Sequence, residues 1–217
     1  MLSHDVPYET QINELACGAA CLSMVFRLFG IPVSSEKIWS DVEKHEGVPF
    51  AQHICSFANK QSVTAMALYL QDCSGEILDF CLLNHLEVIL LQRFVENPFN
   101  GHYTVLIGAD KDFIYYHDPN PNAQDGQGKK ISRYDLLWNM TALENSQMGS
   151  GRQMIIVANQ KHNATVDCMK CFASIPVIPS LVDYLKYKNS SPYGVLCADC
   201  GYATLTAPRH DAHSIFS

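Results

Sequence analysis

Four residues in the first 120 positions have the types and spacing that nucleophilic catalysis requires, and the first is a cysteine. Cys17 lies in "QINELACGAACLSM", where apolar residues recur at helical spacing, so it should open a helix. A helix N-terminus favours a thiolate, because its free N–H groups and its dipole stabilise negative charge. Gly18 follows, and we expect its missing side chain to let a substrate carbonyl approach the helix end.

A histidine and an aspartate are the candidate base and its orienting carboxylate. His102 begins the apolar stretch "HYTVLIGA", and Asp118 ends "DFIYYHDP" after a polar turn. Two such strands form a hairpin whose open ends meet, so the two side chains should be neighbours. His117 competes for this role, but adjacent strand residues point to opposite faces. We therefore predict that Asp118 partners His102, and that His117 faces solvent or substrate.

The fourth residue is Gln11, an uncharged amide six positions before Cys17. Its N–H can donate to the oxygen that becomes negative when a thiolate attacks a carbonyl. Gln11 and the backbone N–H of Cys17 are therefore the predicted oxyanion site. The alternative for Cys17 is an inert helix thiol, which is what we predict for Cys21 one turn later. Three further cysteines are predicted core residues on apolar faces: Cys55, Cys73 and Cys81.

Together, "Q-x5-CGAACLSM", "GHYTVLIGAD" and "YYHDPN" resemble the motifs of the bacteriocin-processing cysteine peptidases, which cut after double-glycine leaders, and of their free-standing relatives. The resemblance spans residues 5–158. It implies a papain-like α+β fold, with a nucleophile, a base, an orienting residue and an oxyanion-hole amide at Cys17, His102, Asp118 and Gln11. The chain departs from the family at Ala16, where Asp usually precedes the nucleophile. No transporter sequence follows, so the free-standing relatives fit at least as well as exporter domains.

Two CxxC pairs near the end, "DCMKCF" and "LCADCGY", have the spacing of a structural zinc site: Cys168, Cys171, Cys197 and Cys200. Four thiolates suit a tetrahedral Zn²⁺ and leave no open position for catalysis. A bound metal also lets a segment too short for its own core fold. We therefore predict a zinc-ribbon-like domain, with a redox dithiol or unrelated thiols as the alternatives.

The elements that must position these residues are helices first and strands later, which indicates an α+β fold rather than βαβ units. Predicted helices cover 16–28, 34–44, 50–61, 75–85 and the stretch "RYDLLWNM", in which Trp138 should pack under the sheet. Predicted strands cover 63–70, 87–94, 102–109, 112–119 and 153–159. The polar stretch "NQKHNATVD" separates a peptidase-like domain, 1–160, from the zinc-ribbon-like domain, 161–217.

Composition limits the class of protein and its surroundings. The chain has 217 residues and a net charge of −7. Nucleic-acid binding usually needs a basic surface, so we do not expect a nucleic-acid partner. No secretory signal is visible, and no apolar run approaches the ~20 residues of a membrane span. We therefore expect a soluble, cytoplasmic protein. Nine cysteines without a signal peptide indicate catalysis or metal binding rather than disulfides.

The predicted function is that of a cysteine peptidase-like hydrolase that acts on a peptide or related amide bond through an acyl-enzyme, with acyl transfer or another amidase reaction as variants. Its partners would be a peptide or protein substrate and a protein bound by the C-terminal domain. Two alternatives remain at this point. One is a non-catalytic peptide-binding module, and the other is a zinc-ribbon protein that binds nucleic acid or protein.

Overall fold

An antiparallel sheet is the centre of the molecule. The computed structural model describes residues 1–42, 51–70, 75–93, 101–123, 125–142, 152–188 and 193–206. In these ranges nine strands form one sheet in the order β11-β10-β2-β7-β3-β4-β5-β6, with β1 paired to β4. The strands of this sheet are β1 (Leu2–Ser3), β2 (Thr64–Leu70), β3 (Leu86–Arg93), β4 (Gly101–Ala109), β5 (Phe113–His117), β6 (Lys129–Ser132), β7 (Gln153–Ala158), β10 (Tyr193–Leu196) and β11 (Ala203–Thr206). The predicted α+β class with an antiparallel sheet is confirmed.

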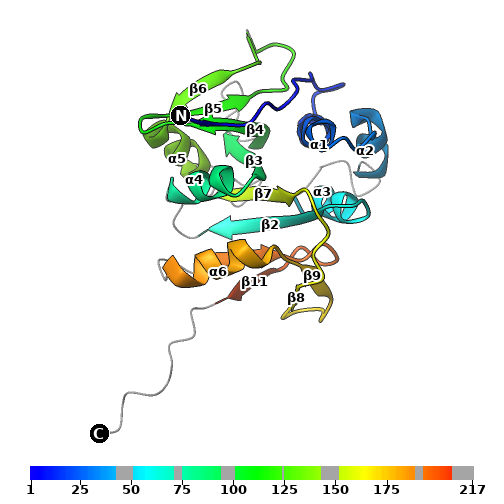
Figure 1. Ribbon diagram of the computed structural model, residues 1–217. Coiled ribbons are helices and arrows are strands. Elements are labelled where there is room, and N and C mark those ends of the chain that lie inside the picture. The colour runs from blue at the N-terminus through cyan, green and yellow to red at the C-terminus, as the bar shows by residue number, and fades with distance from the viewer. Residues whose placement is uncertain are drawn as a thin grey trace, which may run out of the picture.

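In the described ranges, helices cover both faces of the sheet, three on each. They are α1 (Cys17–Leu28), α2 (Ser35–Val42), α3 (Ala51–Asn59), α4 (Glu76–Leu83), α5 (Arg133–Ala142) and α6 (Pro179–Lys188). One apolar core joins α1, α2 and α3 to the sheet, and a second joins α4, α5 and α6 to the other face. Figure 1 shows α1 and α2 to the right of the sheet and α4 and α5 to the left. None of the helices in the described ranges is long and apolar enough to cross a membrane.

The predicted elements of the first 160 residues are confirmed where the structure describes them. The five predicted helices correspond to α1–α5, and the five predicted strands to β2, β3, β4, β5 and β7. The predicted ends of α2 and α3 extend into residues 43–50, which lie outside the described ranges. Two strands that the structure describes in this region were not predicted. β1 is only two residues long, and β6 has four residues.

The hairpin of β4 and β5 carries the candidate base. Val105 pairs with His117 and Ala109 with Ile114, and the register shifts by one residue between Leu106 and Gly108. A bulge of this kind increases the local twist. The strands meet at the turn around Asp110, so the start of β4 and the end of β5 lie together at the opposite end.

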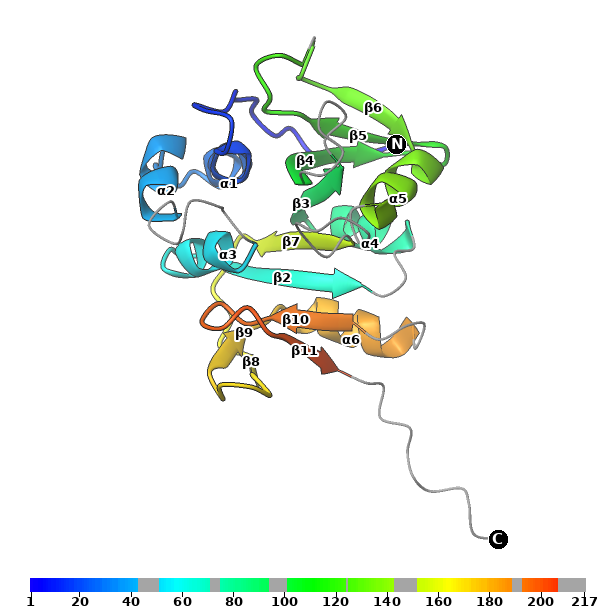
Figure 2. The same cartoon turned by 180° about the vertical axis from the view of Figure 1, so that it is seen from behind.

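The C-terminal segment consists of two hairpins and a helix. β8 (Thr165–Asp167) and β9 (Ser174–Pro176) form a separate two-stranded sheet, and β10 pairs with β11. β10 also pairs with β2, which carries the central sheet into this segment, as Figure 2 shows. None of these elements was predicted from the sequence, although Pro179 at the first position of α6 is a common helix-start signal. Each of the four strands has only three or four residues.

Candidate active site

Cys17 is the first residue of α1, as predicted. The preceding chain turns at Asn13, whose Oδ1 accepts the N–H of Leu15 at 2.9 Å and whose carbonyl accepts the N–H of Ala16 at 3.2 Å. No acidic residue lies in the first turn of α1, and no side chain caps it. The positive end of the helix is therefore not neutralised by an acidic side chain of its own first turn, and the Cys17 thiol sits on it.

Gly18 has a different role from the one we predicted. A Cβ at this position would lie 2.4 Å from Cδ1 of Ile54 and 3.1 Å from Cδ2 of Tyr103. The missing side chain therefore makes room for α3 and β4 to pack against the helix, rather than for a substrate. Close packing is the physical reason for this glycine.

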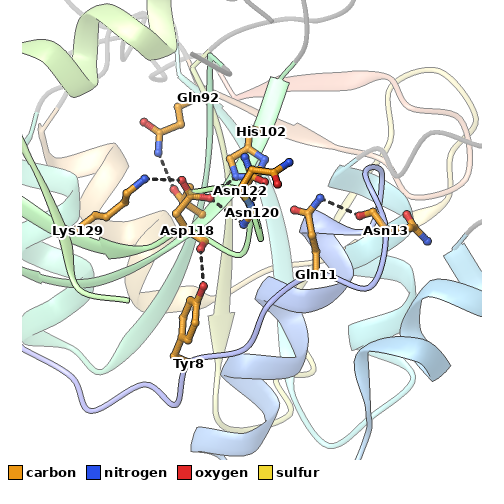
Figure 3. Close-up of polar contacts among 10 residues, drawn as sticks. Tyr8, Gln11, Asn13, Gln92, His102, Asp118, Asn120, Asn122 and Lys129 are labelled. Atoms are coloured by element: carbon orange, nitrogen blue, oxygen red, sulfur yellow. Dashed lines mark hydrogen bonds and ion pairs between the residues drawn. The ribbon is translucent and has the colours of Figure 1, made fainter. Parts of the chain in front are cut away.

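His102 and Asp118 are neighbours, as the hairpin predicted. The Nε2 atom of His102 lies 2.7 Å from Oδ1 of Asp118, and both residues are buried. Because Val105 pairs with His117, Asp118 follows at the open end of the hairpin, on the face from which His102 leaves β4. The Cys17 thiol contributes to the raised pKa of His102 and therefore lies near the same imidazole. Figure 3 shows the His102–Asp118 pair.

The charges of this site favour an imidazolium. Burial lowers the pKa of His102, but the hydrogen bonds and negative charges of Asp118 and Cys17 outweigh it and raise the pKa to about 9. Burial works to raise the pKa of Asp118. The contacts of the carboxylate with His102, the amide of Asn120 and Lys129 outweigh it, so this pKa is lowered. A carboxylate beside an imidazolium is the arrangement that stabilises a thiolate partner.

Gln11 lies beside the loop that carries Asp118, since its backbone N–H donates to Pro119 O at 2.8 Å. The side-chain Nε2 donates to Asn13 O at 2.8 Å, as Figure 3 shows. The Oε1 atom is buried without a hydrogen-bond partner. The side-chain amide of Gln11 therefore donates one N–H to the turn before Cys17, and its oxygen has no hydrogen-bond partner. Rotation about the bond between Cγ and Cδ would redirect the N–H donors.

His117 does not face solvent or substrate, and that prediction is wrong. It is buried on the other face of β5, where Nε2 lies 2.8 Å from Val6 O and Nδ1 accepts the N–H of Gly128 at 3.0 Å. A carbonyl requires a donor and an N–H requires an acceptor, so the ring is neutral with its proton on Nε2. Burial lowers the pKa of His117 and keeps it neutral.

Several residues that hold Asp118 in place were not identified from the sequence. Lys129 Nζ lies 3.2 Å from Oδ2, and the N–H of Asn120 donates to Oδ1 at 3.0 Å. The hydroxyl of Tyr8 donates to the carbonyl of Asp118 at 3.2 Å. "DPNPN" offered a signal for Asn120, because Asp side chains often accept the N–H two residues on. Nothing local marks Lys129 or Tyr8, which reach the site only through the fold.

The other predictions for single residues have mixed outcomes. Cys21, Cys55 and Cys81 are buried as predicted, and burial raises the pKa of each thiol. Cys73 lies outside the described residues. Trp138 was predicted to pack under the sheet, but it is half exposed and lies over the guanidinium of Arg93, 5.6 Å from ring centroid to Cζ.

Four cysteines come together in the C-terminal segment. The Sγ atoms of Cys168, Cys171, Cys197 and Cys200 all lie within 4.8 Å of one another. Cys168 Sγ is 3.6 Å from Cys200 Sγ, and Cys171 Sγ is 3.6 Å from Cys197 Sγ. A disulfide has a sulfur separation of about 2.0 Å. Four sulfurs around one zinc, at about 2.3 Å from the metal, are roughly 3.8 Å apart, so the cluster has the size of a metal site.

The two CxxC pairs are built alike, each as the turn of a hairpin. In the first, the N–H of Phe172 donates to Cys168 O, and that of Cys168 to Ala173 O. In the second, the N–H of Gly201 donates to Cys197 O, and that of Cys197 to Tyr202 O, and all four distances fall between 2.8 and 3.0 Å. Phe172 (φ 60°) and Gly201 (φ 67°) both have left-handed backbones. Hydrogen bonds from the amides of Cys171 and Lys170 lower the pKa of Cys168 to about 6. Burial raises the pKa of Cys197, and at Cys200 burial and the neighbouring thiols outweigh the amide of Tyr202 and raise the pKa.

The comparison with family models identifies the class. The model described as the Peptidase_C39 like family matches residues 3–146, more than half of the chain. The chain belongs to this family, which confirms the resemblance, and its function is accordingly cysteine peptidase-like. No curated protein gives a significant match to the sequence.

Solved structures share the fold at low sequence identity. The peptidase domain of Streptococcus ComA, a bi-functional ABC transporter in a quorum-sensing pathway, has a TM-score of 0.55 and 18% identity, over 72% of this chain and 100% of that one. A structure described as a C39-like peptidase from Bacillus anthracis has a TM-score of 0.54 and 16% identity, over 73% and 96%. A double glycine motif protease from an AMS/PCAT transporter, in complex with the leader peptide, has a TM-score of 0.50 and 20% identity, over 71% and 91%.

Proposed function

We propose that this protein hydrolyses a peptide or related amide bond with Cys17 as nucleophile, His102 as base and Asp118 as the orienting residue. The observation that carries the proposal is the buried pair of His102 and Asp118, with Nε2 at 2.7 Å from Oδ1, next to the Cys17 thiol that also raises the pKa of this imidazole. Helix α1 and the hairpin of β4 and β5, which lie far apart in the sequence, contribute these groups. Membership of a cysteine peptidase-like family supports the same chemistry.

The reaction would proceed in two halves. In the first, the Cys17 thiol gives its proton to His102 Nδ1, and sulfur bonds to the carbonyl carbon. His102 then protonates the amine as the carbon–nitrogen bond breaks, which leaves a thioester on Cys17. In the second half, His102 takes a proton from water, the hydroxide bonds to the carbonyl carbon, and the carbon–sulfur bond breaks to release a carboxylic acid. The sulfur then takes the proton back from His102. An amine in place of water would give acyl transfer from the same thioester.

The oxyanion that forms in each half needs donors. The backbone N–H of Cys17 lies at the open end of α1, and Gln11 is tethered to Pro119 beside the orienting aspartate. In the proposal, the Gln11 amide leaves Asn13 O and donates to the oxyanion when substrate is bound. A single donor of this kind typically contributes 10²–10³ in rate.

The proposed substrate is a peptide or protein. The double glycine motif protease with a similar fold was solved with a leader peptide, so a peptide is the first substrate class to test here. The proposed compartment is the reducing cytoplasm, because the cysteines of the described ranges are free thiols and four of them form a metal-sized cluster.

The decisive experiment measures the alkylation rate of Cys17 with iodoacetamide by peptide mapping. At the N-terminus of α1 and beside the imidazole of His102, Cys17 should react at pH 6 about tenfold or more faster than free cysteine. His102→Ala should remove this advantage. Cys21→Ala, which deletes a buried thiol, is the matched control and should leave it intact. A Cys17 that reacts no faster than free cysteine at pH 6 would contradict the proposal.

We propose in addition that the four C-terminal cysteines hold one structural Zn²⁺. The matching turns, the sulfur separations of 3.6 Å and the amides directed at Cys168 support this assignment. Residues 161–217 would then form the metal-binding unit, whose β10 docks on β2. Its exposed side chains include Met169 and Phe172, next to the cluster, which suit the proposed role of contacting a protein partner.

Metal analysis of the purified full chain tests the zinc proposal. One zinc per chain is expected, and the double variant Cys168→Ser/Cys200→Ser should lose it. Cys55→Ser, which removes a buried thiol of α3, is the control and should retain the metal. A metal-free wild type that unfolds no more easily than the same protein incubated with zinc would argue against a structural metal.

A further inference from the structure

We propose that Lys129 is a positioning residue of the candidate active site. Lys129 binds Oδ2 of Asp118, which keeps Oδ1 against His102, and its positive charge offsets the charge of the carboxylate. The inference rests on the proposed function of His102 and Asp118. It concerns a residue that lies in β6, outside the motifs that marked the site in the sequence.

The contacts of Asp118 divide between its two oxygens. Oδ1 accepts His102 Nε2 at 2.7 Å and the N–H of Asn120 at 3.0 Å. Oδ2 lies 3.2 Å from Lys129 Nζ. Figure 3 shows Lys129 and His102 reaching Asp118 from opposite sides. A carboxylate with a donor on each oxygen cannot rotate without losing one of them, so Lys129 fixes the orientation in which Oδ1 faces the imidazole.

The start of β6 aims Lys129 at the site. Lys129 pairs with Tyr116 of β5, and Gly128 before it has φ +69° and donates its N–H to His117 Nδ1. The loop also closes on Asp118 directly, whose N–H donates to Gly126 O at 2.8 Å. A Cβ on Gly126 would lie 2.4 Å from Asp118 O, so only glycine permits this approach. The backbone of the loop before β6 therefore fixes the position of the Lys129 ammonium next to Asp118.

The charges explain what Lys129 would change. Asp118 favours the imidazolium of His102, and a cation on the far side of the carboxylate weakens that effect. The other titratable groups facing this pair in the described residues are Cys17 and Cys21 from α1, Tyr8 from the N-terminal segment and Tyr116 from β5. Burial, and then the negative charge of Asp118, raise the pKa of both tyrosines, which stay neutral. The Lys129 side chain is 29% exposed, so salt should screen part of its effect.

The test compares two lysines that are neighbours in β6. Lys129→Gln removes the ammonium at Asp118. Lys130→Gln removes the same charge one residue away, where Nζ lies 5.0 Å from the ring centroid of Phe113. The imidazole titration of His102 is followed by NMR in a Cys17→Ala background, which needs neither substrate nor thiol chemistry. Lys129→Gln should move the midpoint up by about half to one pH unit, and 1 M salt should reduce the difference.

Lys129→Arg keeps the charge and should leave the midpoint at its starting value, as should Lys130→Gln. Lys129→Met, which keeps the aliphatic stem, repeats the test if the glutamine variant does not fold. An unmoved midpoint in Lys129→Gln, or an equal shift in Lys130→Gln, would overturn the proposal. The proposed function fails separately, through a Cys17 thiol without enhanced alkylation, whatever the NMR titration shows.

Discussion

His117 and Asp118 are consecutive in the chain, yet they bind partners on opposite sides of the sheet at the end of β5. The imidazole of His117 joins the N-terminal segment to the loop before β6, through Val6 O and the N–H of Gly128. The carboxylate of Asp118 binds His102 and Lys129. On one face His117 therefore holds together the segments around the site, and on the other face Asp118 binds the candidate base.

Replacement of His117 by leucine should cost stability in a pH-dependent way. It leaves Val6 O and the N–H of Gly128 without partners, at about 1–3 kcal/mol. The pKa of His117 is lowered in the folded state, so the unfolded chain binds the proton more readily. The wild type therefore loses stability as the pH falls below about 6.5, and His117→Leu lacks this loss. Urea unfolding should show a smaller difference in the free energy of unfolding between wild type and His117→Leu at pH 5 than at pH 7.5. The same difference at both pH values would contradict this prediction.

The raised pKa of His102 gives the opposite pH dependence. Its folded pKa is about 9 and its unfolded value about 6.5, so the imidazolium stabilises the fold fully below 6.5. That contribution, about 3 kcal/mol, is lost as the pH rises through 9. The free energy of unfolding of wild type should fall toward that of His102→Gln between pH 6.5 and 9.5. A difference between the two that stays flat across this range would show that His102 has an ordinary pKa.

Gly18→Ala should destabilise the protein by about 1–3 kcal/mol, because the new methyl group meets Cδ1 of Ile54. Ile54→Val removes that atom and alone should cost about 0.5–1.5 kcal/mol. The double variant should therefore be more stable than the sum of the two losses implies, which urea unfolding measures. Strict additivity would mean that the clash is relieved elsewhere, for example by movement of Tyr103.

The two CxxC turns offer a matched pair of substitutions. Phe172 has φ 60° with an 81% exposed side chain, and a left-handed backbone costs a non-glycine residue roughly 1–2 kcal/mol. Phe172→Gly should therefore stabilise the zinc-loaded chain by about 0.5–1 kcal/mol. Gly201→Ala, at φ 67°, should destabilise it by about 1 kcal/mol. Thermal unfolding of both variants with zinc present checks the prediction, which fails if the two shifts have the same sign.

The sequence predicted those parts of the fold and of the candidate site that follow from short-range patterns, such as apolar spacing, hairpin pairing and the CxxC motif. The spacing of apolar residues identified α1 and β4, and hairpin geometry alone brought His102 and Asp118 together. The CxxC spacing identified the four-sulfur cluster in the same way. The first two depend on contacts within one helix or one hairpin, whereas the cysteine cluster joins two separate turns and was predicted from the motif that each turn carries.

The sequence was insufficient where a contact joins distant segments. Lys129 and Tyr8 reach Asp118 from opposite directions in the chain, and neither carries a local signal. The same reason explains the error at Gly18, whose role depends on Ile54 and Tyr103 in other elements. Alternation correctly separated His117 from Asp118, but it did not reveal that Val6 and Gly128 bury the histidine.

The position of β2 in the sheet has a consequence for how the chain folds during synthesis. Its two neighbours are β7, which ends at residue 158, and β10, which ends at residue 196. Neither neighbour has been synthesised when residues 64–70 leave the ribosome. Both edges of β2 therefore stay unpaired until β7 is made, and one edge stays unpaired until β10 is made. Because the second turn of the cysteine cluster directly follows β10, metal capture would be among the last events, at the moment when the sheet closes over this strand.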